Sequence, residues 1–386
     1  MSSVLAAATP ATAVERHIRV MVVDDALVAR RVLTRWIGVE PDMMVTGCLR
    51  TGREAVEQIE QYDPDVVVLD VDMPELDGIS ALPMLLKKKP ELVVIMASTL
   101  TRRSAEISLR ALSLGAADYV PKPEASPDAA TAAAFHRELI DKIRTLGRRG
   151  RSFFRGPPGP PARQPRPAPH GPADEPAHRA GLAFTLRPFS LAAPQALLIG
   201  ASTGGPQALT TLIGQIGSTM ERVPILITQH MPPTFTTVLA EHLARVSGRP
   251  VREAEHDEVV GAGRVYVAPG GRHMRVTRGR GGPAIALGDD PPINYCKPSV
   301  DPMLSSAAAV WGSGSVALVL TGMGSDGMRG AADVAAAGGS VIAQDEATSV
   351  VWGMPRSVAQ AGLCSAVLPL GEIATKVNSL FAGDRT

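Results

Sequence analysis

Cysteine is scarce in this sequence. Its 386 residues include three cysteines, Cys48, Cys296 and Cys364, which lie far apart and form no C-x-x-C pair. Neither a disulfide framework nor a cysteine-based zinc site is therefore indicated. Reduced thiols, typical of the cytoplasm, are the expected state.

An excess of charge of one sign is also absent. Lys and Arg total 39 and Asp and Glu total 38, so the formal net charge is +1. This balance gives no electrostatic reason to expect a nucleic-acid partner. No apolar run reaches the ~18–20 residues that a membrane-spanning helix needs, and the first residues lack the basic region and long apolar core of a signal peptide. We expect a cytoplasmic protein that does not insert into a membrane.

Proline, by contrast, is concentrated in one segment. From Gly156 to Pro176 the sequence reads GPPGPPARQPRPAPHGPADEP. Such proline density prevents helix and sheet pairing and favours an extended linker; a ligand for a proline-binding module is the alternative. We therefore predict two domains, at residues 17–147 and 191–383, joined by a Pro-rich linker at 148–190.

Both halves alternate between short β-branched runs and segments with helical spacing. In the first half, runs such as IRVMVV and DVVVLD each precede a stretch with apolar residues about 3.6 positions apart. In the second half the same alternation is interrupted around residues 264–287, where a hairpin insertion is expected. The fold class predicted is therefore α/β, with two doubly wound parallel-sheet domains, the first flavodoxin-like and the second Rossmann-like.

Acidic and basic side chains follow successive strands of the first half. Asp24 and Asp25 follow the first predicted strand, Asp70 ends the third, Ser98 the fourth and Lys122 the fifth. A flavodoxin-like strand order brings these side chains to one edge of the sheet. Carboxylates gathered there repel one another unless a divalent cation such as Mg²⁺ is bound, and Asp70 is then a candidate phosphoryl acceptor. The alternative for each single acid is an ordinary helix cap.

These motifs give the first half a clear resemblance. VVDD at 22–25, VVLDVDMPELDG at 67–78, VIMAST at 94–99 and YVPKP at 119–123 are similar to those of response-regulator receiver domains. The resemblance implies a phosphorylated aspartate, a Mg²⁺ site and a histidine kinase as phosphodonor. The residues implied are Asp70 as phospho-acceptor, Asp24, Asp25, Asp70 and the backbone carbonyl of Asp72 as metal ligands, and Ser98, Tyr119 and Lys122 as switch residues.

The second half has a serine, a histidine and an aspartate, each after a predicted strand. Ser202 lies in the G-x-S-x-G pattern of residues 200–204, His230 ends the run ILITQH, and Asp326 lies in a glycine-rich turn after VALVL. Alone, each has a structural alternative, such as a helix cap for Ser202. Together they supply a nucleophile, a base and a group that orients the base. Their order along the chain differs from that of α/β-hydrolases.

Residues 194–381 resemble the catalytic domain of chemotaxis protein-glutamate methylesterases. The matching motifs are IGASTGGPQAL, ITQHMPPTFT, YVAPGGRHM, PSVDPML, LTGMGSDGMRG and IAQDEATSVVWGMP. The resemblance implies that Ser202 is the nucleophile, His230 the base and Asp326 its orienting partner, with the N–H groups of Thr203 and Met323 as the oxyanion hole. It implies no metal at the esterase site.

The same resemblance implies a substrate and a form of control. The substrate would be a glutamate methyl ester on a chemoreceptor, and receptor glutamines would also be deamidated. The unphosphorylated receiver would pack over the esterase cleft until phosphorylation releases it. Two alternatives remain at this point: a non-catalytic regulator whose second half binds a partner, and a hydrolase whose receiver no longer regulates it.

Overall fold

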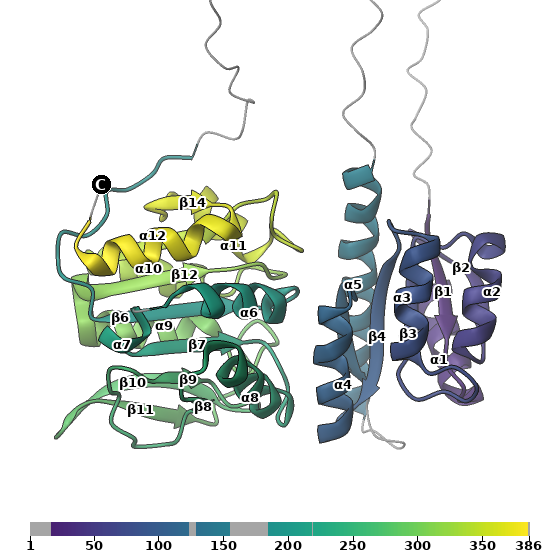
Figure 1. The fold of residues 1–386 in the computed structure, drawn as a ribbon, viewed down its shortest axis with the longest axis horizontal. Coiled ribbons are helices and arrows are strands. Elements are labelled where there is room, and N and C mark those ends of the chain that lie inside the picture. Colours follow the sequence, from purple (N-terminus) through teal and green to yellow (C-terminus); the bar gives the residue numbers. More distant parts are fainter. Residues whose placement is uncertain (1–16, 123–128, 155–183, 218, 385–386) are drawn as a thin grey trace, which may run out of the picture.

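The computed structural model describes residues 17–122, 129–154, 184–217 and 219–384 (Figure 1). The proline-rich segment Gly156–Pro176 lies outside these ranges, so the prediction of an extended linker is not addressed by them. Among the helices of the described residues, none is both long and apolar enough to pass through a bilayer.

The first half forms a parallel five-stranded sheet in the order β2-β1-β3-β4-β5. This is the predicted flavodoxin-like order, with α1 and α5 on one face and α2, α3 and α4 on the other. The strands are β1 (Ile18–Val23), β2 (Met43–Leu49), β3 (Val66–Asp70), β4 (Val93–Thr99) and β5 (Asp118–Lys122). The helices are α1 (Leu27–Gly38), α2 (Gly52–Tyr62), α3 (Gly78–Lys88), α4 (Arg102–Ser113) and α5 (Ala129–Phe154).

Local sequence signals explain where these helices begin. The side chains of Thr51, Asp77 and Thr101 accept hydrogen bonds from backbone N–H groups in the first turns of α2, α3 and α4. Such caps satisfy N–H groups that have no partner within the helix. Helix α5 continues to Phe154, past residue 147, where we expected the first domain to end.

The second half forms a parallel seven-stranded sheet in the order β14-β13-β12-β6-β7-β9-β8. Its strands are β6 (Ala196–Ala201), β7 (Ile225–Gln229), β8 (Val251–Glu253), β9 (Val265–Val267), β12 (Ser315–Val319), β13 (Ser340–Gln344) and β14 (Ala366–Leu368). The predicted hairpin is confirmed as β10 (His273–Gly279) and β11 (Gly282–Gly288), which pair antiparallel. Residues 265–267, which we expected within that insertion, belong instead to the parallel sheet.

Helices cover both faces of this second sheet. They are α6 (Gly205–Gln215), α7 (Thr219–Arg222), α8 (Phe235–Ser247), α9 (Val300–Trp311), α10 (Met328–Ala336), α11 (Met354–Gln360), α12 (Leu370–Ala382) and the 3-10 helix η1 (Gly312–Gly314). Helices α6, α8 and α12 pack on one face, and α9, α10 and α11 on the other. Strands β7, β9 and β8 extend the sheet on the β6 side, and β13 and β14 extend it on the side of its neighbour β12. The carboxyl ends of β6 and β12 are therefore the topological switch point, where α/β sheets bind ligands.

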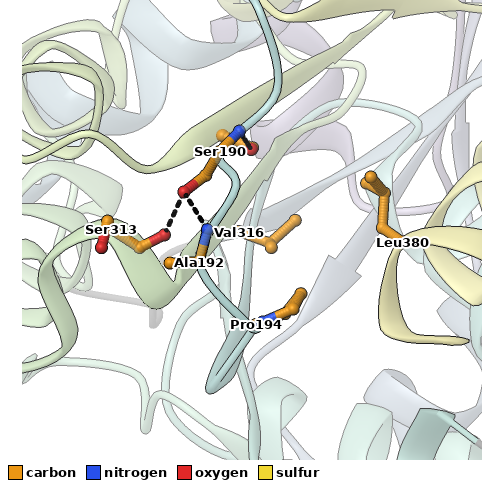
Figure 2. Close-up of a pocket in the computed structure, with 7 residues that line it drawn as sticks. Ser190, Ala192, Pro194, Ser313, Val316 and Leu380 are labelled. Carbon is orange, nitrogen blue, oxygen red and sulfur yellow. Dashed lines mark hydrogen bonds between the residues drawn. The ribbon is translucent and has the colours of Figure 1, made fainter. Parts of the chain in front are cut away.

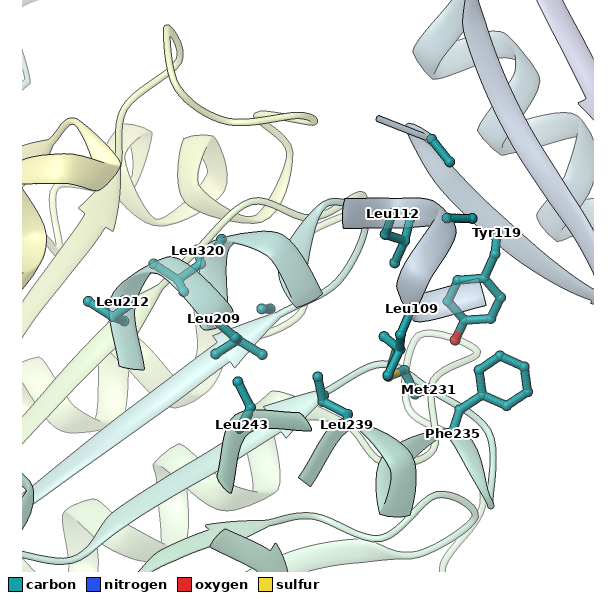
Figure 3. Packing of buried hydrophobic residues seen from close by; sticks show 14 of the residues in the cluster. Leu109, Leu112, Tyr119, Leu209, Leu212, Met231, Phe235, Leu239, Leu243 and Leu320 are labelled. Atoms are coloured by element: carbon teal, nitrogen blue, oxygen red, sulfur yellow. The ribbon is translucent and has the colours of Figure 1, made fainter. Parts of the chain in front are cut away.

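The two halves pack against each other. Apolar side chains of α4 and β5 meet those around α8, so that buried residues of both halves form one continuous cluster (Figure 3). At its edge the Tyr119 ring stacks on Phe235, with ring centroids 4.8 Å apart and planes 9° from parallel. Beside the cluster, Arg102 of α4 forms an ion pair with Glu241 of α8 at 2.6 Å.

A second contact involves helix α5 of the first half. The Thr145 hydroxyl donates a hydrogen bond to the Met323 sulfur at 3.5 Å. The Arg137 guanidinium lies 4.2 Å from the centroid of the Tyr295 ring. Val351 belongs to the apolar cluster that includes α5, and Met323 and Val350 pack against that cluster. The first half therefore contacts the loops after β12 and β13, at the carboxyl edge of the second sheet.

Candidate active site

Three carboxylates meet at the carboxyl edge of the first sheet. Asp24, Asp25 and Asp70 each place a ligand atom within 4.8 Å of the others. The Lys122 ammonium, at the end of β5, is 2.6 Å from an Asp24 oxygen and 2.7 Å from an Asp70 oxygen. A set of hard oxygen donors of this kind fits Mg²⁺. Asp72, two residues beyond β3, has an exposed side chain, and a metal contact from its carbonyl stays a prediction.

The Asp70 side chain is almost completely buried. Burial raises its pKa, Lys122 opposes that rise, and the net result is a pKa of about 6. Asp24 adds to the rise because two neighbouring negative charges repel. A bound cation relieves this repulsion and favours the ionised, nucleophilic form of Asp70.

The predicted switch residues lie near this edge but contact different partners. The Ser98 hydroxyl is buried and shares a hydrogen bond with Ser108 at 2.8 Å. Tyr119 is 5% exposed and points toward the second half, where its ring stacks on Phe235. Burial raises the pKa of the Tyr119 phenol well above its usual value, so it stays neutral.

Ser202 directly follows β6, and hydrogen bonds to its backbone groups fix its position. Its N–H donates to the Thr321 carbonyl at 3.0 Å, and its carbonyl accepts from Gly205 N at 2.7 Å and Gln229 Nε2 at 2.9 Å. Gly204, with φ of +76°, makes the sharp turn into α6, and a Cβ there would collide with Val350. The G-x-S-x-G pattern thus fixes the direction in which the serine leaves the strand.

His230 lies beside Ser202 because β6 and β7 are paired neighbours. Ala201 is opposite Gln229 in this ladder, and the His230 N–H donates to the Ala201 carbonyl at 3.1 Å. The imidazole Nε2 is 2.6 Å from an Asp326 carboxylate oxygen, and both side chains are buried. The three predicted residues therefore converge at the carboxyl ends of β6, β7 and β12.

Asp326 is the acceptor for several donors besides the imidazole. The Ser299 hydroxyl and the N–H groups of Val300 and Gly327 donate to its carboxylate at 2.7, 2.6 and 2.9 Å. Burial by itself raises the pKa of Asp326, but the bond from His230 and these further bonds outweigh it and lower the pKa to about 2. The carboxylate is therefore ionised and fixed in direction.

The second ring nitrogen of His230 faces a cysteine. Its Nδ1 is 3.3 Å from the Cys296 sulfur. Among the described residues, the Ser202 hydroxyl has no hydrogen bond to the imidazole. Burial lowers the pKa of His230, whereas Cys296 and Asp326 together raise it more strongly, to about 10.

The two N–H groups expected in the oxyanion hole have no protein acceptor. Within the part of the chain that the structure describes, neither the Thr203 nor the Met323 N–H donates to a carbonyl or side chain. Unpaired donors beside a nucleophile are what a developing oxyanion requires. Their role in an oxyanion hole stays a prediction.

Sequence reasoning missed several groups at this site. Ser299 and Val300 belong to the PSVDPML motif, which we identified without assigning it a role, and they hold Asp326. Cys296 precedes that motif and showed no signal except being a cysteine. Phe235, which receives the Tyr119 ring, belongs to the motif ITQHMPPTFT, to which we likewise assigned no role at this position.

A small cavity lies elsewhere in the second half. It lies at the amino ends of β6 and β12 and is lined by residues including Ser190, Pro194 and Val316 (Figure 2). The Ser190 hydroxyl donates to the Ser313 carbonyl at 2.8 Å there. This cavity is at the edge of the sheet opposite Ser202 and is separate from the candidate active site.

Comparison with known proteins agrees with this geometry. The CheB methylesterase family matches residues 197–377, and the response regulator receiver domain family matches residues 20–134. The chain is 58% identical to a protein-glutamate methylesterase/protein-glutamine glutaminase of group 2 operon from Rhodopseudomonas palustris, over 100% of both chains. It is 59% identical to proteins named protein-glutamate methylesterase/protein-glutamine glutaminase from Bradyrhizobium diazoefficiens, over 96% of this chain and 95% of the relative, and from Nitrobacter hamburgensis, over 96% of both chains. The chain belongs to the family of CheB methylesterases that carry a response regulator receiver domain.

Proposed function

We propose that this protein is a cytoplasmic, phosphorylation-activated hydrolase that demethylates glutamate methyl esters on chemoreceptors and deamidates receptor glutamines. The observation that carries the proposal is the buried His230–Asp326 pair, at 2.6 Å, beside Ser202 at the switch point of a parallel sheet. The two activities are those in the names of its relatives. Chemoreceptors are the proposed substrates and a histidine kinase the proposed phosphodonor.

The proposed reaction is acyl transfer through Ser202. The serine oxygen attacks the ester carbonyl while its proton moves to His230, and the N–H groups of Thr203 and Met323 stabilise the oxyanion. The imidazolium then gives that proton to the leaving methoxide, and methanol departs. Water attacks the acyl-enzyme with His230 again as base, which releases the glutamate carboxylate and restores the serine. With a glutamine substrate, ammonia is the first product.

Asp326 orients the base throughout this cycle. Because it accepts bonds from His230, Ser299 and the start of α9, it holds the ring by Nε2, so Nδ1 is the nitrogen left to accept the Ser202 proton. It also stabilises the imidazolium that forms when the proton arrives. No residue of the esterase site is assigned to a metal.

The receiver half is proposed to control access to this site. Helix α5 contacts Met323, the source of one proposed oxyanion donor, and β5 places Tyr119 against Phe235. When bound, Mg²⁺ would be held by Asp24, Asp25 and Asp70 and would neutralise charge during phosphoryl transfer. Phosphorylated Asp70 offers oxygens to Lys122 and Ser98, and movement of Ser98 and Tyr119 toward them weakens the Tyr119–Phe235 contact.

The decisive test measures methanol release from methylated receptor by the purified full chain. Wild type, Ser202→Ala and the control Ser325→Ala are compared with and without acetyl phosphate. Ser325 is an exposed serine next to Asp326, so its loss controls for a hydroxyl removed from the same region. We expect release by wild type and Ser325→Ala only. Release by Ser202→Ala at the wild-type rate would reject the proposed nucleophile.

Control by the receiver is tested with Asp70→Asn. We expect this variant to keep the basal rate and to lose the response to acetyl phosphate and Mg²⁺, since its amide cannot be phosphorylated. The fraction phosphorylated is followed in parallel by intact-protein mass. Full stimulation of Asp70→Asn would refute the proposed switch, and absence of stimulation in phosphorylated wild type would favour a receiver that no longer regulates.

A further inference from the structure

Cys296 lies in a tight turn between the hairpin and α9. Ile293 and Cys296 exchange backbone hydrogen bonds of 3.1 and 2.8 Å across the turn. The two residues between them, Asn294 and Tyr295, have φ values of +51° and +64°. Two consecutive left-handed residues define a two-residue turn of the kind that closes β-hairpins. The turn therefore fixes the directions of both Tyr295 and Cys296.

One side of this turn contacts the catalytic histidine. The Cys296 sulfur is 3.3 Å from Nδ1 of His230, while Nε2 is held by Asp326 at 2.6 Å. An imidazole has only two nitrogens. Nδ1 is therefore the nitrogen that has to take the proton of Ser202, and in this structure Cys296 occupies it.

The other side of the turn contacts the receiver. Tyr295 projects from the second half with its ring beneath the Arg137 guanidinium of α5, at 4.2 Å. A cation over an aromatic face is attractive. The same short turn thus joins the receiver helix to the ring nitrogen that catalysis needs.

We propose that Cys296 is a positioning residue that holds His230 through Nδ1 while the receiver is docked, and that it has to release the imidazole before Ser202 can react. The inference rests on the proposed function, because it concerns the same histidine. It adds a second level of control: docking does not only restrict access to the site but also keeps the base engaged with the Cys296 sulfur.

The protonation of His230 agrees with this arrangement. The groups that face its ring are Asp326 from the loop before α10 and Cys296 from the turn, with Asp301 of α9 behind Asp326. Burial opposes a charged ring, but the sulfur and the Asp326 carboxylate stabilise it, so the pKa of His230 is about 10. A protonated ring cannot act as a base. The basal rate of wild type should therefore still be rising at the alkaline end of its pH range, and loss of the sulfur should move that rise to lower pH.

The test compares wild type, Cys296→Ala and Cys296→Ser, with Cys48→Ala as control. Cys48 is an exposed thiol on β2 of the receiver, remote from the esterase site. Methanol release is measured from pH 6 to 9.5, without phosphodonor and with acetyl phosphate. We expect Cys296→Ala to raise the basal rate at pH 7.5 by about 2- to 10-fold, the change that one ordinary hydrogen bond supports. Its pH profile should level off at least about one unit lower than that of wild type.

The remaining measurements distinguish a positioning role of Cys296 from a merely structural one. With phosphodonor, Cys296→Ala and wild type should agree within about twofold, because the contact is already released. Cys296→Ser, which keeps a hydrogen-bonding group, should retain a basal rate near wild type. Equal basal rates and equal pH profiles for wild type and Cys296→Ala would overturn the proposal, as would loss of the stimulated rate in folded Cys296→Ala and Cys296→Ser. If phosphorylated wild type itself releases no methanol, the proposed function fails instead.

Discussion

The stacked pair of Tyr119 and Phe235 gives the sharpest test of how the receiver restrains the esterase. The ring centroids are 4.8 Å apart, and the rings come from β5 and from the first residue of α8. An aromatic pair contributes about 0.5–1.5 kcal/mol beyond the area that it buries. Since 1.4 kcal/mol is tenfold in an equilibrium, losing the pair should raise the undocked fraction, and with it the basal rate, by about 2- to 12-fold.

The experiment is a double-mutant cycle with Tyr119→Leu, Phe235→Leu and the double variant. Each single change removes the stack and keeps an apolar side chain, so each should raise basal methanol release by a similar factor. The double variant should show little further increase, because both singles remove the same interaction. Phe381→Leu, on α12 and in the same core cluster, is the matched control and should leave the ratio of stimulated to basal rate unchanged.

Two outcomes would refute the reasoning. If the single variants keep the wild-type basal rate while thermal unfolding shows them folded, the stack does not restrain the esterase. If the two effects multiply fully in the double variant, the two side chains act independently, and the contact between them is not the cause. In either case the proposed role of Tyr119 as a switch residue would be rejected.

Three further predictions concern single positions. Asp326→Asn should lower the stimulated kcat by about 10³- to 10⁴-fold, because an amide neither orients nor stabilises the imidazolium as a carboxylate does; a kcat within tenfold of wild type would contradict that role. Gly322→Ala should lower kcat by up to about 10²-fold with unchanged circular dichroism, because a Cβ there would lie 2.8 Å from the Ser202 Cβ and displace the nucleophile; normal kcat would show that the site adjusts. A hydrogen bond from Arg144 lowers the pKa of Asp42, so this pair stabilises the receiver above the usual aspartate pKa, and the contribution is lost as the pH falls through the lowered pKa of Asp42. In urea unfolding, Asp42→Asn should cost less than about 1 kcal/mol at pH 7 and progressively less as the pH is lowered below about 4, and a cost that does not change with pH would contradict the assignment.

The sequence by itself determined the local elements and the kind of residue at each strand end. The short, β-branched apolar runs form the strands of two parallel sheets. The hairpin lies where apolar and polar residues alternate along the sequence. Asp70, Ser202, His230 and Asp326 could be proposed as site residues because each ends or closely follows a buried strand, and parallel strands end at one edge. These inferences depend only on the order and spacing of residues that are close together along the chain, and the sequence gives both directly.

The tertiary structure alone decided which strand ends meet and what surrounds them. Strand order places β12 beside β6 although more than a hundred residues separate them, and this brings Asp326 to His230. Cys296 at Nδ1 and Phe235 under Tyr119 likewise come from distant segments. Such contacts form when whole faces of helices and sheets pack together, so the partner of each side chain depends on many non-local contacts at once. A contact of this kind leaves no periodic pattern in the sequence.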